Sequence, residues 1–210
     1  MKHIIFSYIF LLLFLFVGGC SGPIPSGEDY SEIDVSGDPV QVSEKGDSIL
    51  KGEKDCTYTI KPVARYKISA MVVGKKSYSF GCKAKVSPVD LALAWGKLAD
   101  PKSGKYITYS QSDRWYFYEY KPDSPVNNSY IISHSSNNHI IPANDNILRA
   151  IKTIKKKEKI ILEGQLVNIN GIHKGETFWW NSSLARSDTG DSSCEVFYVT
   201  KVSVGDKVYE

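Results

Sequence analysis

The chain has 210 residues and carries 26 Lys and Arg side chains against 23 Asp and Glu, a formal net charge of +3. A nucleic-acid-binding domain needs clustered basic residues and a strongly basic balance. Here Lys residues cluster only over 152–159, so we expect no nucleic-acid partner. We interpret that run as the solvated end of a helix, where the helix dipole favours cations, with an anionic-surface patch as the alternative.

Residues 1–19 have the pattern of a secretory signal peptide. Lys2 supplies a positive start, an apolar run follows from Ile4 to Val17, and small residues precede Cys20. The apolar run is shorter than the roughly 20 residues that a transmembrane helix needs. The sequence therefore predicts export and cleavage of residues 1–19.

The segment Val17-Gly18-Gly19-Cys20 resembles the lipobox of bacterial lipoproteins. The resemblance implies that the Cys20 thiol is diacylated and that the chain is cut just before it. Two or more acyl chains anchor a protein stably, whereas one binds a bilayer only marginally. Ser21 stands where such lipoproteins of double-membrane bacteria carry a residue other than Asp when they are sorted to the outer membrane. We expect a lipid-anchored envelope protein, with an ordinary signal peptide and an incidental cysteine as the alternative.

Residues 20–55 are rich in Gly, Pro, Ser, Asp and Glu and show no sustained hydrophobic period. This composition predicts a lipidated flexible tether. Residues 56–210 are long enough for one domain of ordinary size and contain no internal repeat. We expect a single α+β domain there.

The elements expected in this domain alternate between strands and short helices. Ser87-Pro88-Val89-Asp90 has the pattern of a helix start, with a stop at Gly96, and Asn144 or Asp145 can cap a second helix. Asn170-Gly171 predicts a turn. The expected strands are 66–73, 107–120, 130–133, 158–169, 176–181 and 195–202. This order predicts a small, mostly antiparallel β-barrel or sheet of OB-like type with one or two short helices.

Four segments together are similar to those of a widespread group of uncharacterised bacterial exported proteins. These segments are residues 87–96, 111–116, 138–143 and 180–190. The resemblance covers most of the chain beyond the tether. It implies one compact domain and supplies no chemistry, because no activity is known for the group.

Asp188-Thr189-Gly190 matches the active-site triplet of aspartic proteases, but polar residues precede it and the chain has no second copy. We interpret it as a turn. Asp188, Asp191 and Glu195 offer oxygen ligands for a calcium loop, although their spacing is not that of an EF-hand. We expect no metal or other cofactor.

The segment around His134 and His139 has the His-Ile-Ile-Pro start of HNH nucleases, and both histidines with His173 could supply nitrogen ligands to zinc. Neither spacing fits a standard pattern, so we favour a hydrogen-bonded polar loop before a helix. Residues 134–146 and 179–191 are both rich in donors and acceptors. Because loops at one end of a small barrel converge, we expect the two segments to lie side by side, with Arg186 or Asp188 contacting residues 134–139. The candidate polar site comprises His134, Asn138, His139, Arg186, Asp188 and Asp191.

The cysteines that remain after lipidation are Cys56, Cys82 and Cys194. Because three is an odd number, at most one intramolecular disulfide can form in the oxidising envelope. We favour Cys56 with Cys82 over Cys82 with Cys194, and three reduced thiols stay as the alternative.

No phosphate-binding loop, nucleophile elbow or Cys-x-x-Cys pair is present in the sequence. The expected function is therefore that of an envelope lipoprotein whose domain binds a protein or glycan partner without catalysis. The alternative is a metal-assisted or His/Asp hydrolase that uses His134, His139, Asp188 and Asp191. The sequence does not assign an individual catalytic role to any of these four residues.

Overall fold

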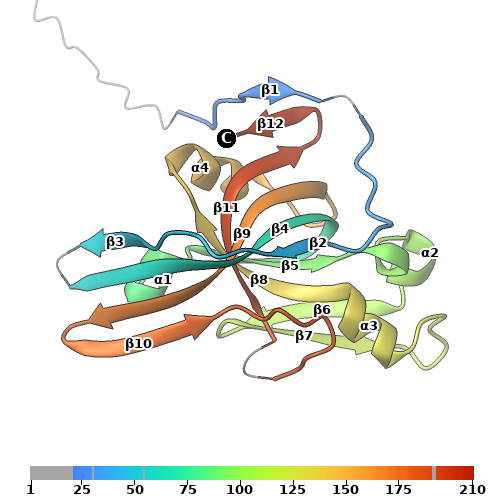
Figure 1. Cartoon of the computed structure of the whole chain (residues 1–210). Helices are drawn as coiled ribbons and strands as arrows, with labels where there is room; N and C mark the ends of the chain where they lie inside the picture. Colours follow the sequence, from blue (N-terminus) through green and yellow to red (C-terminus); the bar gives the residue numbers. More distant parts are fainter. Residues whose placement is uncertain (1–20, 30, 54, 191–192) are drawn as a thin grey trace, which may run out of the picture.

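The computed structural model describes residues 21–29, 31–53, 55–190 and 193–210 (Figure 1). Its strands are β1 (Gly27–Glu28), β2 (Val40–Ser43), β3 (Ile49–Glu53), β4 (Cys56–Ser77), β5 (Val89–Ala94), β6 (Ile107–Ser112), β7 (Trp115–Tyr120), β8 (Ser135–Pro142), β9 (Lys159–His173), β10 (Glu176–Asn181), β11 (Glu195–Val204) and β12 (Lys207–Tyr209). Its helices are α1 (Cys82–Val86), η1 (Gly96–Leu98), α2 (Pro101–Gly104), α3 (Asn128–His134) and α4 (Asp145–Thr153). The α+β class predicted from the sequence is confirmed.

One large mixed sheet dominates the fold, and β4 is its longest strand. One edge of β4 pairs with β9, and the other edge pairs in turn with β3, β2 and β5. β5 pairs with β8, β8 runs parallel to β11, and β11 returns to β9. The pairings β4–β9, β4–β5, β5–β8, β8–β11 and β11–β9 form a cycle. We call this cycle the ring, and its strand order is OB-like. The other strands continue beyond the ring, so the sheet as a whole is not closed into a barrel.

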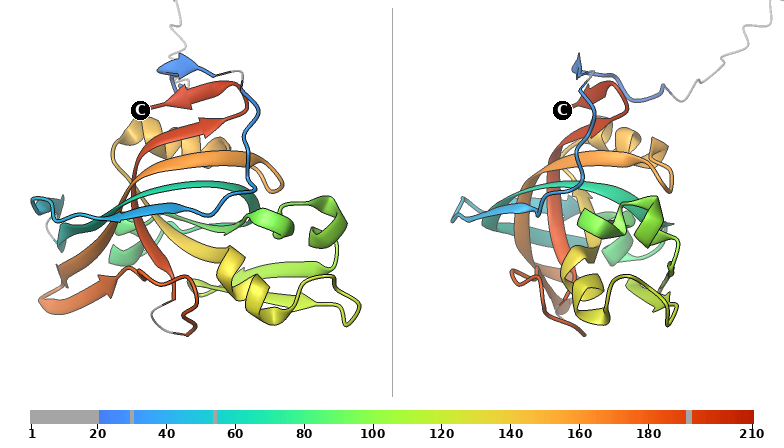
Figure 2. Two further views of the ribbon diagram at one scale, coloured as in Figure 1. Left: turned by 45° about the vertical axis from the view of Figure 1, so that its right-hand side comes forward. Right: turned by 90° about the vertical axis from the view of Figure 1, so that its right-hand side faces the viewer.

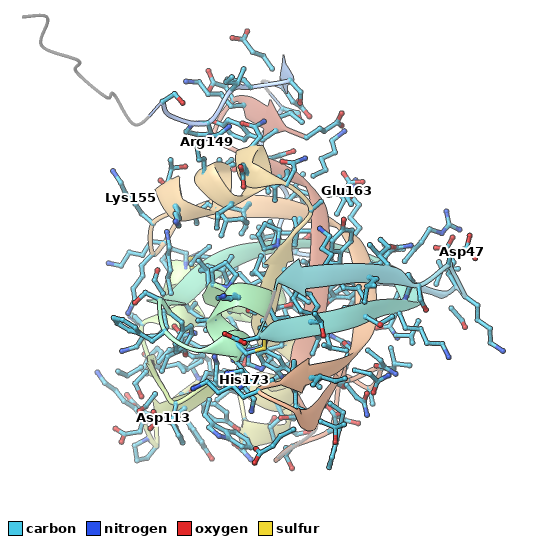
Figure 3. All side chains as sticks on the ribbon, turned by 90° about the vertical axis from the view of Figure 1, so that its left-hand side faces the viewer. Asp47, Asp113, Arg149, Lys155, Glu163 and His173 are labelled. Atoms are coloured by element: carbon cyan, nitrogen blue, oxygen red, sulfur yellow. A yellow bond between two sulfur atoms is a disulfide. The ribbon has the colours of Figure 1, made fainter. Side chains whose placement is uncertain are left out.

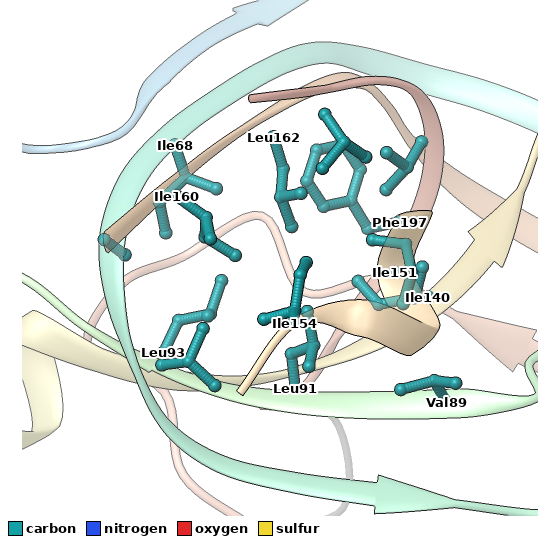
Figure 4. Close-up of a cluster of buried hydrophobic side chains, with 14 of the residues drawn as sticks. Ile68, Val89, Leu91, Leu93, Ile140, Ile151, Ile154, Ile160, Leu162 and Phe197 are labelled. Atoms are coloured by element: carbon teal, nitrogen blue, oxygen red, sulfur yellow. The ribbon is translucent and has the colours of Figure 1, made fainter. Parts of the chain in front are cut away.

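Apolar side chains fill the ring because each of its strands turns alternate residues inward. Ile68, Leu91 and Phe197 from three different strands are fully buried there (Figure 4). Each such side chain contributes about 1.5–3 kcal/mol when it leaves water. The apolar face of α4, including Ile147 and Ile151, packs into the same cluster together with Ile154 just after the helix, and fills one end of the ring.

A second sheet region, which we call the wing, consists of β3, residues 56–62 of β4, residues 167–173 of β9, and β10. Its inner face packs on α1 and on the outer side of β8 and β11. A disulfide joins Cys56 on β4 to Cys82 on α1, which is the pair favoured from the sequence. Charged side chains such as those of Asp47 and Lys155 lie on the surface (Figure 3).

Two expected elements have the opposite structure. Residues 89–94 form β5 instead of a helix, and all six side chains are buried. The strand is covered on both faces. The ring lies on one side and the β6–β7 hairpin on the other, where Arg114 reaches Asp90 and Ile107 packs with Ala94. Residues 130–133 belong to α3 instead of a strand, because the Asn127 side chain accepts a hydrogen bond from the Tyr130 amide.

Two turns lie elsewhere than expected. The predicted strand 107–120 is a hairpin whose turn is formed by Asp113 and Arg114, with φ angles of 49° and 74°. Non-glycine residues seldom adopt positive φ. Because residues 113–114 contain no glycine, the sequence carried no signal for a turn there. The turn expected at 170–171 is also wrong: β9 continues to His173, and the chain reverses at Lys174 and Gly175.

The segment 135–142, expected as a polar loop, is the strand β8, which is almost entirely buried. The helix after it is α4, and the Asn144 side chain caps it by accepting a hydrogen bond from the Ile147 amide at 2.9 Å. At its other end, the Lys75 ammonium donates to the carbonyl oxygens of Ile151, Lys152 and Ile154 at 3.0, 2.8 and 2.7 Å. Such donors satisfy carbonyls that the end of a helix leaves unpaired.

The expectation of a flexible tether is wrong for the part of 20–55 that the structure describes. β1 pairs with β12, and β2 and β3 pair with β4. Between β1 and β2 the chain runs down one side of the ring past α2 (Figure 2). There Ile33 and Val35 pack against Ala99. Few apolar residues are needed to order this segment, because backbone pairing of β1, β2 and β3 holds the rest of it in place.

The signal peptide (residues 1–19) and Cys20 lie outside the described residues, so export, cleavage and lipidation stay predictions. Within the described part of the chain, no helix is both long and apolar enough to cross a membrane.

Candidate functional site

The end of the ring opposite α4 opens into a cavity of about 200 Å³. We call it the mouth pocket. Aromatic side chains line one side of it, namely Trp95, Trp115, Tyr116 and Tyr118. Residues of the 182–194 loop and the start of β11 line the other side, and the charged ones are Arg186, Asp188 and Glu195. The pocket therefore combines aromatic surface with charged groups of both signs.

Glu195 enters the pocket because it begins β11. Phe197, two residues later, points into the ring core, so Glu195 points to the same side at the open end. It lies opposite Asn138 in the parallel pairing of β11 with β8. Its side chain is only 2% exposed, so a carboxylate is buried at the floor of the site.

Arg186 forms an ion pair with this carboxylate. The same guanidinium donates to the Tyr66 hydroxyl at 3.0 Å and to Oε1 of Gln41 at 3.2 Å. Burial raises the pKa of Glu195, an effect that Arg186 opposes. Burial alone would lower the pKa of Arg186, but Glu195 beside it raises that pKa. These contacts hold the loop to β2, β4 and β11.

Two buried oxygens, one in the pocket lining and one on the neighbouring strand, have no hydrogen-bond partner among the residues described. They are Oε2 of Glu195 and Oδ1 of Asn138, from neighbouring strands. Buried acceptors without partners are rare, because each forfeits the hydrogen bond that it had with water. Donors from a bound molecule or from solvent would satisfy them.

Asp188 and Cys194 complete the polar side of the pocket. Oδ2 of Asp188 accepts a hydrogen bond of 2.6 Å from the Ser183 hydroxyl, which fixes the loop. The Cys194 thiol is not part of a disulfide, and burial raises its pKa to about 12. This thiol is therefore neutral at physiological pH and a poor nucleophile.

A second polar cluster lies on the outer face of β5 and β8. Oδ1 of Asp90 is 3.0 Å from Nδ1 of His139 and 2.9 Å from a guanidinium nitrogen of Arg114. The Arg114 guanidinium also lies 3.5 Å from the centre of the Tyr78 ring, and His139 packs on Trp180 with ring centres 4.3 Å apart. Asp90 and His139 are almost completely buried, so this cluster has the character of a structural network.

His134 lies in neither cluster. At the end of α3 its ring stacks on Tyr130, with centres 3.7 Å apart. Its Nε2 is 3.7 Å from Oδ1 of Asp38. His173 pairs with Cys56 in the wing, so the three histidines proposed as zinc ligands lie in three different places. Among the described residues, no three metal-binding side chains gather at one point.

The residues of the candidate polar site predicted from the sequence thus lie in different parts of the structure. Arg186 and Asp188 line the mouth pocket, and Asn138 lies beside its floor. His139 belongs to the outer cluster, where its contact with Trp180 joins the two segments expected to lie side by side. The contacts that fix Arg186 and Asp188 are with Tyr66, Gln41, Glu195 and Ser183 instead of residues 134–139. Asp191 lies outside the described residues.

Sequence reasoning missed the aromatic side of the pocket and the role of Glu195 as its floor. For Glu195 the sequence held a signal. It is an acid in the same alternating series as Phe197 and Val199, which point into the ring core from β11. The position of Trp115 and Tyr116 depends on the turn at residues 113–114, which the sequence did not predict.

Comparison of the chain with protein-family models, with curated proteins and with solved structures finds no match. The site is therefore interpreted from its own geometry.

Proposed function

We propose that this chain is a lipid-anchored envelope protein that binds a protein or glycan partner at the mouth pocket. The observation that carries the proposal is the pocket itself, where aromatic side chains face a buried carboxylate with an unpartnered oxygen. Ligand sites commonly combine apolar walls with a few polar groups that fix orientation. The anchor at Cys20 would hold this site close to a membrane.

The position of the pocket in the fold supports the same proposal. In OB folds, the connection between the fourth and fifth strands contributes to ligand binding. Here the corresponding connection joins β9 to β11 and contains β10 and the 182–194 loop. That loop supplies Arg186 and Asp188 to the pocket.

The hydrolase alternative has less support. Catalysis by an Asp–His pair needs a histidine that reaches substrate, whereas His139 is 3% exposed and is held between Asp90 and Trp180. Asp188 instead accepts a hydrogen bond from the Ser183 hydroxyl within the loop. The geometry favours binding over catalysis.

Site-specific photo-cross-linking tests the proposal in intact envelopes. A photoreactive residue at Thr189, on the rim of the pocket, should give a discrete cross-linked species. The matched control is the same residue at Thr177, which is exposed on the wing. Equal products from both positions, or products that survive Trp115→Ala unchanged, would refute a binding site at the mouth.

A further inference from the structure

The charges in the mouth pocket do not balance. Arg186 contributes one formal positive charge, and Asp188 and Glu195 contribute two negative ones. Arg186 is paired with Glu195 and also interacts electrostatically with Asp188. One guanidinium thus faces two carboxylates, and the described lining keeps one net negative formal charge. A cation is therefore the ligand that this set of side chains favours.

The aromatic side favours the same class of ligand. Aromatic ring faces attract cations, most strongly where water is excluded. The rings of Tyr116 and Tyr118 are tilted at 41° with centres 6.1 Å apart, and the Trp95 and Trp115 side chains line the same space. Burial raises the pKa of Tyr116 to about 12, so its ring stays neutral at physiological pH.

The unpartnered oxygens are an independent indication. Oε2 of Glu195, which lines the pocket, is a buried acceptor that lacks a donor among the described residues, and Oδ1 of Asn138 on the neighbouring strand is another. A ligand in the pocket that brings N–H donors would satisfy the Glu195 oxygen, and an ammonium group has three donors and no acceptor. The charge, the rings and the free acceptors all fit one chemical group.

We propose that the mouth pocket receives the side chain of a lysine from a partner protein, a proposal that rests on the binding function above. The ammonium group lies near Asp188 and Oε2 of Glu195, and the methylene stem packs along the aromatic side. A cavity of about 200 Å³ has room for a single side chain. An amino sugar carries the same ammonium group, but its ring is bulkier than an unbranched stem and has no run of methylenes to pack there.

Calorimetry with the chain that begins at Ser21 tests the assignment. The probe is the peptide acetyl-Gly-Lys-Gly-amide. Its control replaces lysine with norleucine, which keeps the four-carbon stem and removes the ammonium group. We expect a Kd on the order of 1 mM for the lysine peptide and binding at least about tenfold weaker for norleucine. Glucosamine should bind more weakly than the lysine peptide.

Asp188→Asn should weaken lysine binding about fivefold or more without lowering the melting temperature, because asparagine can still accept from Ser183. The matched control is Asp206→Asn, in the exposed turn before β12, which should leave binding unchanged. Equal binding of the lysine and norleucine peptides would overturn the ammonium site. Preferential binding of glucosamine would overturn the lysine assignment in favour of a glycan.

The two proposals fail in different ways. Loss of peptide binding together with continued cross-linking from Thr189 would overturn the lysine site and leave the binding function standing. Loss of specific cross-linking as well would overturn both. Binding that depends on the ammonium group and on Asp188 supports the assignment.

Discussion

Oδ1 of Asp90 on β5 lies 3.0 Å from Nδ1 of His139 on β8, and the two residues are direct cross-strand partners. Both side chains are buried, and Arg114 from the β6–β7 turn reaches the same carboxylate. One carboxylate thus joins two ring strands to the hairpin that covers them.

Asp90→Ala should lower the free energy of unfolding by about 3–5 kcal/mol, because it leaves the guanidinium of Arg114 partly buried without its carboxylate. Asp123→Ala, at an exposed position, should change it by less than about 0.5 kcal/mol. Urea denaturation measures both. A change below about 1 kcal/mol in Asp90→Ala would show that the cluster does not stabilise the fold.

This cluster also shows why the sequence predicted some elements and missed others. The capped start of α4 and the strand 176–181 depend on local signals, and both were expected. β5 and β8 are buried on both faces by a hairpin distant in the sequence, so Asp90 looked like part of a helix start and His139 like part of a loop. No local pattern shows that a polar residue has a buried partner on another strand.

The N-terminal segment should stabilise the domain. Ile33 and Val35 are buried, and each contributes about 1.5–3 kcal/mol. A chain that begins at Cys56 lacks both residues along with β1, β2 and β3. It should melt at least about 6 °C below the chain that begins at Ser21. Equal melting temperatures in calorimetry would restore the interpretation of this segment as a tether.

Cys194 should react slowly with alkylating reagents in the folded protein. With a pKa of about 12, roughly one thiol in ten thousand is ionised at pH 8, and the thiolate is the reactive species. The rate should rise about tenfold for each pH unit up to pH 10. Mass spectrometry after iodoacetamide treatment measures it, with the urea-unfolded chain as the control. Similar rates for folded and unfolded protein would mean that the thiol is not buried.

Cys20→Ser should move the protein from the membrane fraction to the soluble or uncleaved pool, because the cysteine thiol is the site of lipid attachment in the lipobox. Cys194→Ser is the matched control, since Cys194 lies in the folded domain, and should stay with the membrane. Immunoblots of fractionated cells distinguish the outcomes. A Cys20→Ser protein that is still processed and still membrane-bound would contradict the anchor.

The four tryptophans of the chain allow the most direct test of the mouth pocket as the binding site. Trp95 and Trp115 line the pocket, whereas Trp179 is exposed on the wing. Their indole N–H resonances can be followed by NMR while the partner captured through Thr189 is added. If the partner binds in the mouth pocket, the signals of Trp95 and Trp115 shift and the signal of Trp179 does not. A shift of Trp179 with the two pocket signals unchanged would contradict binding at the pocket.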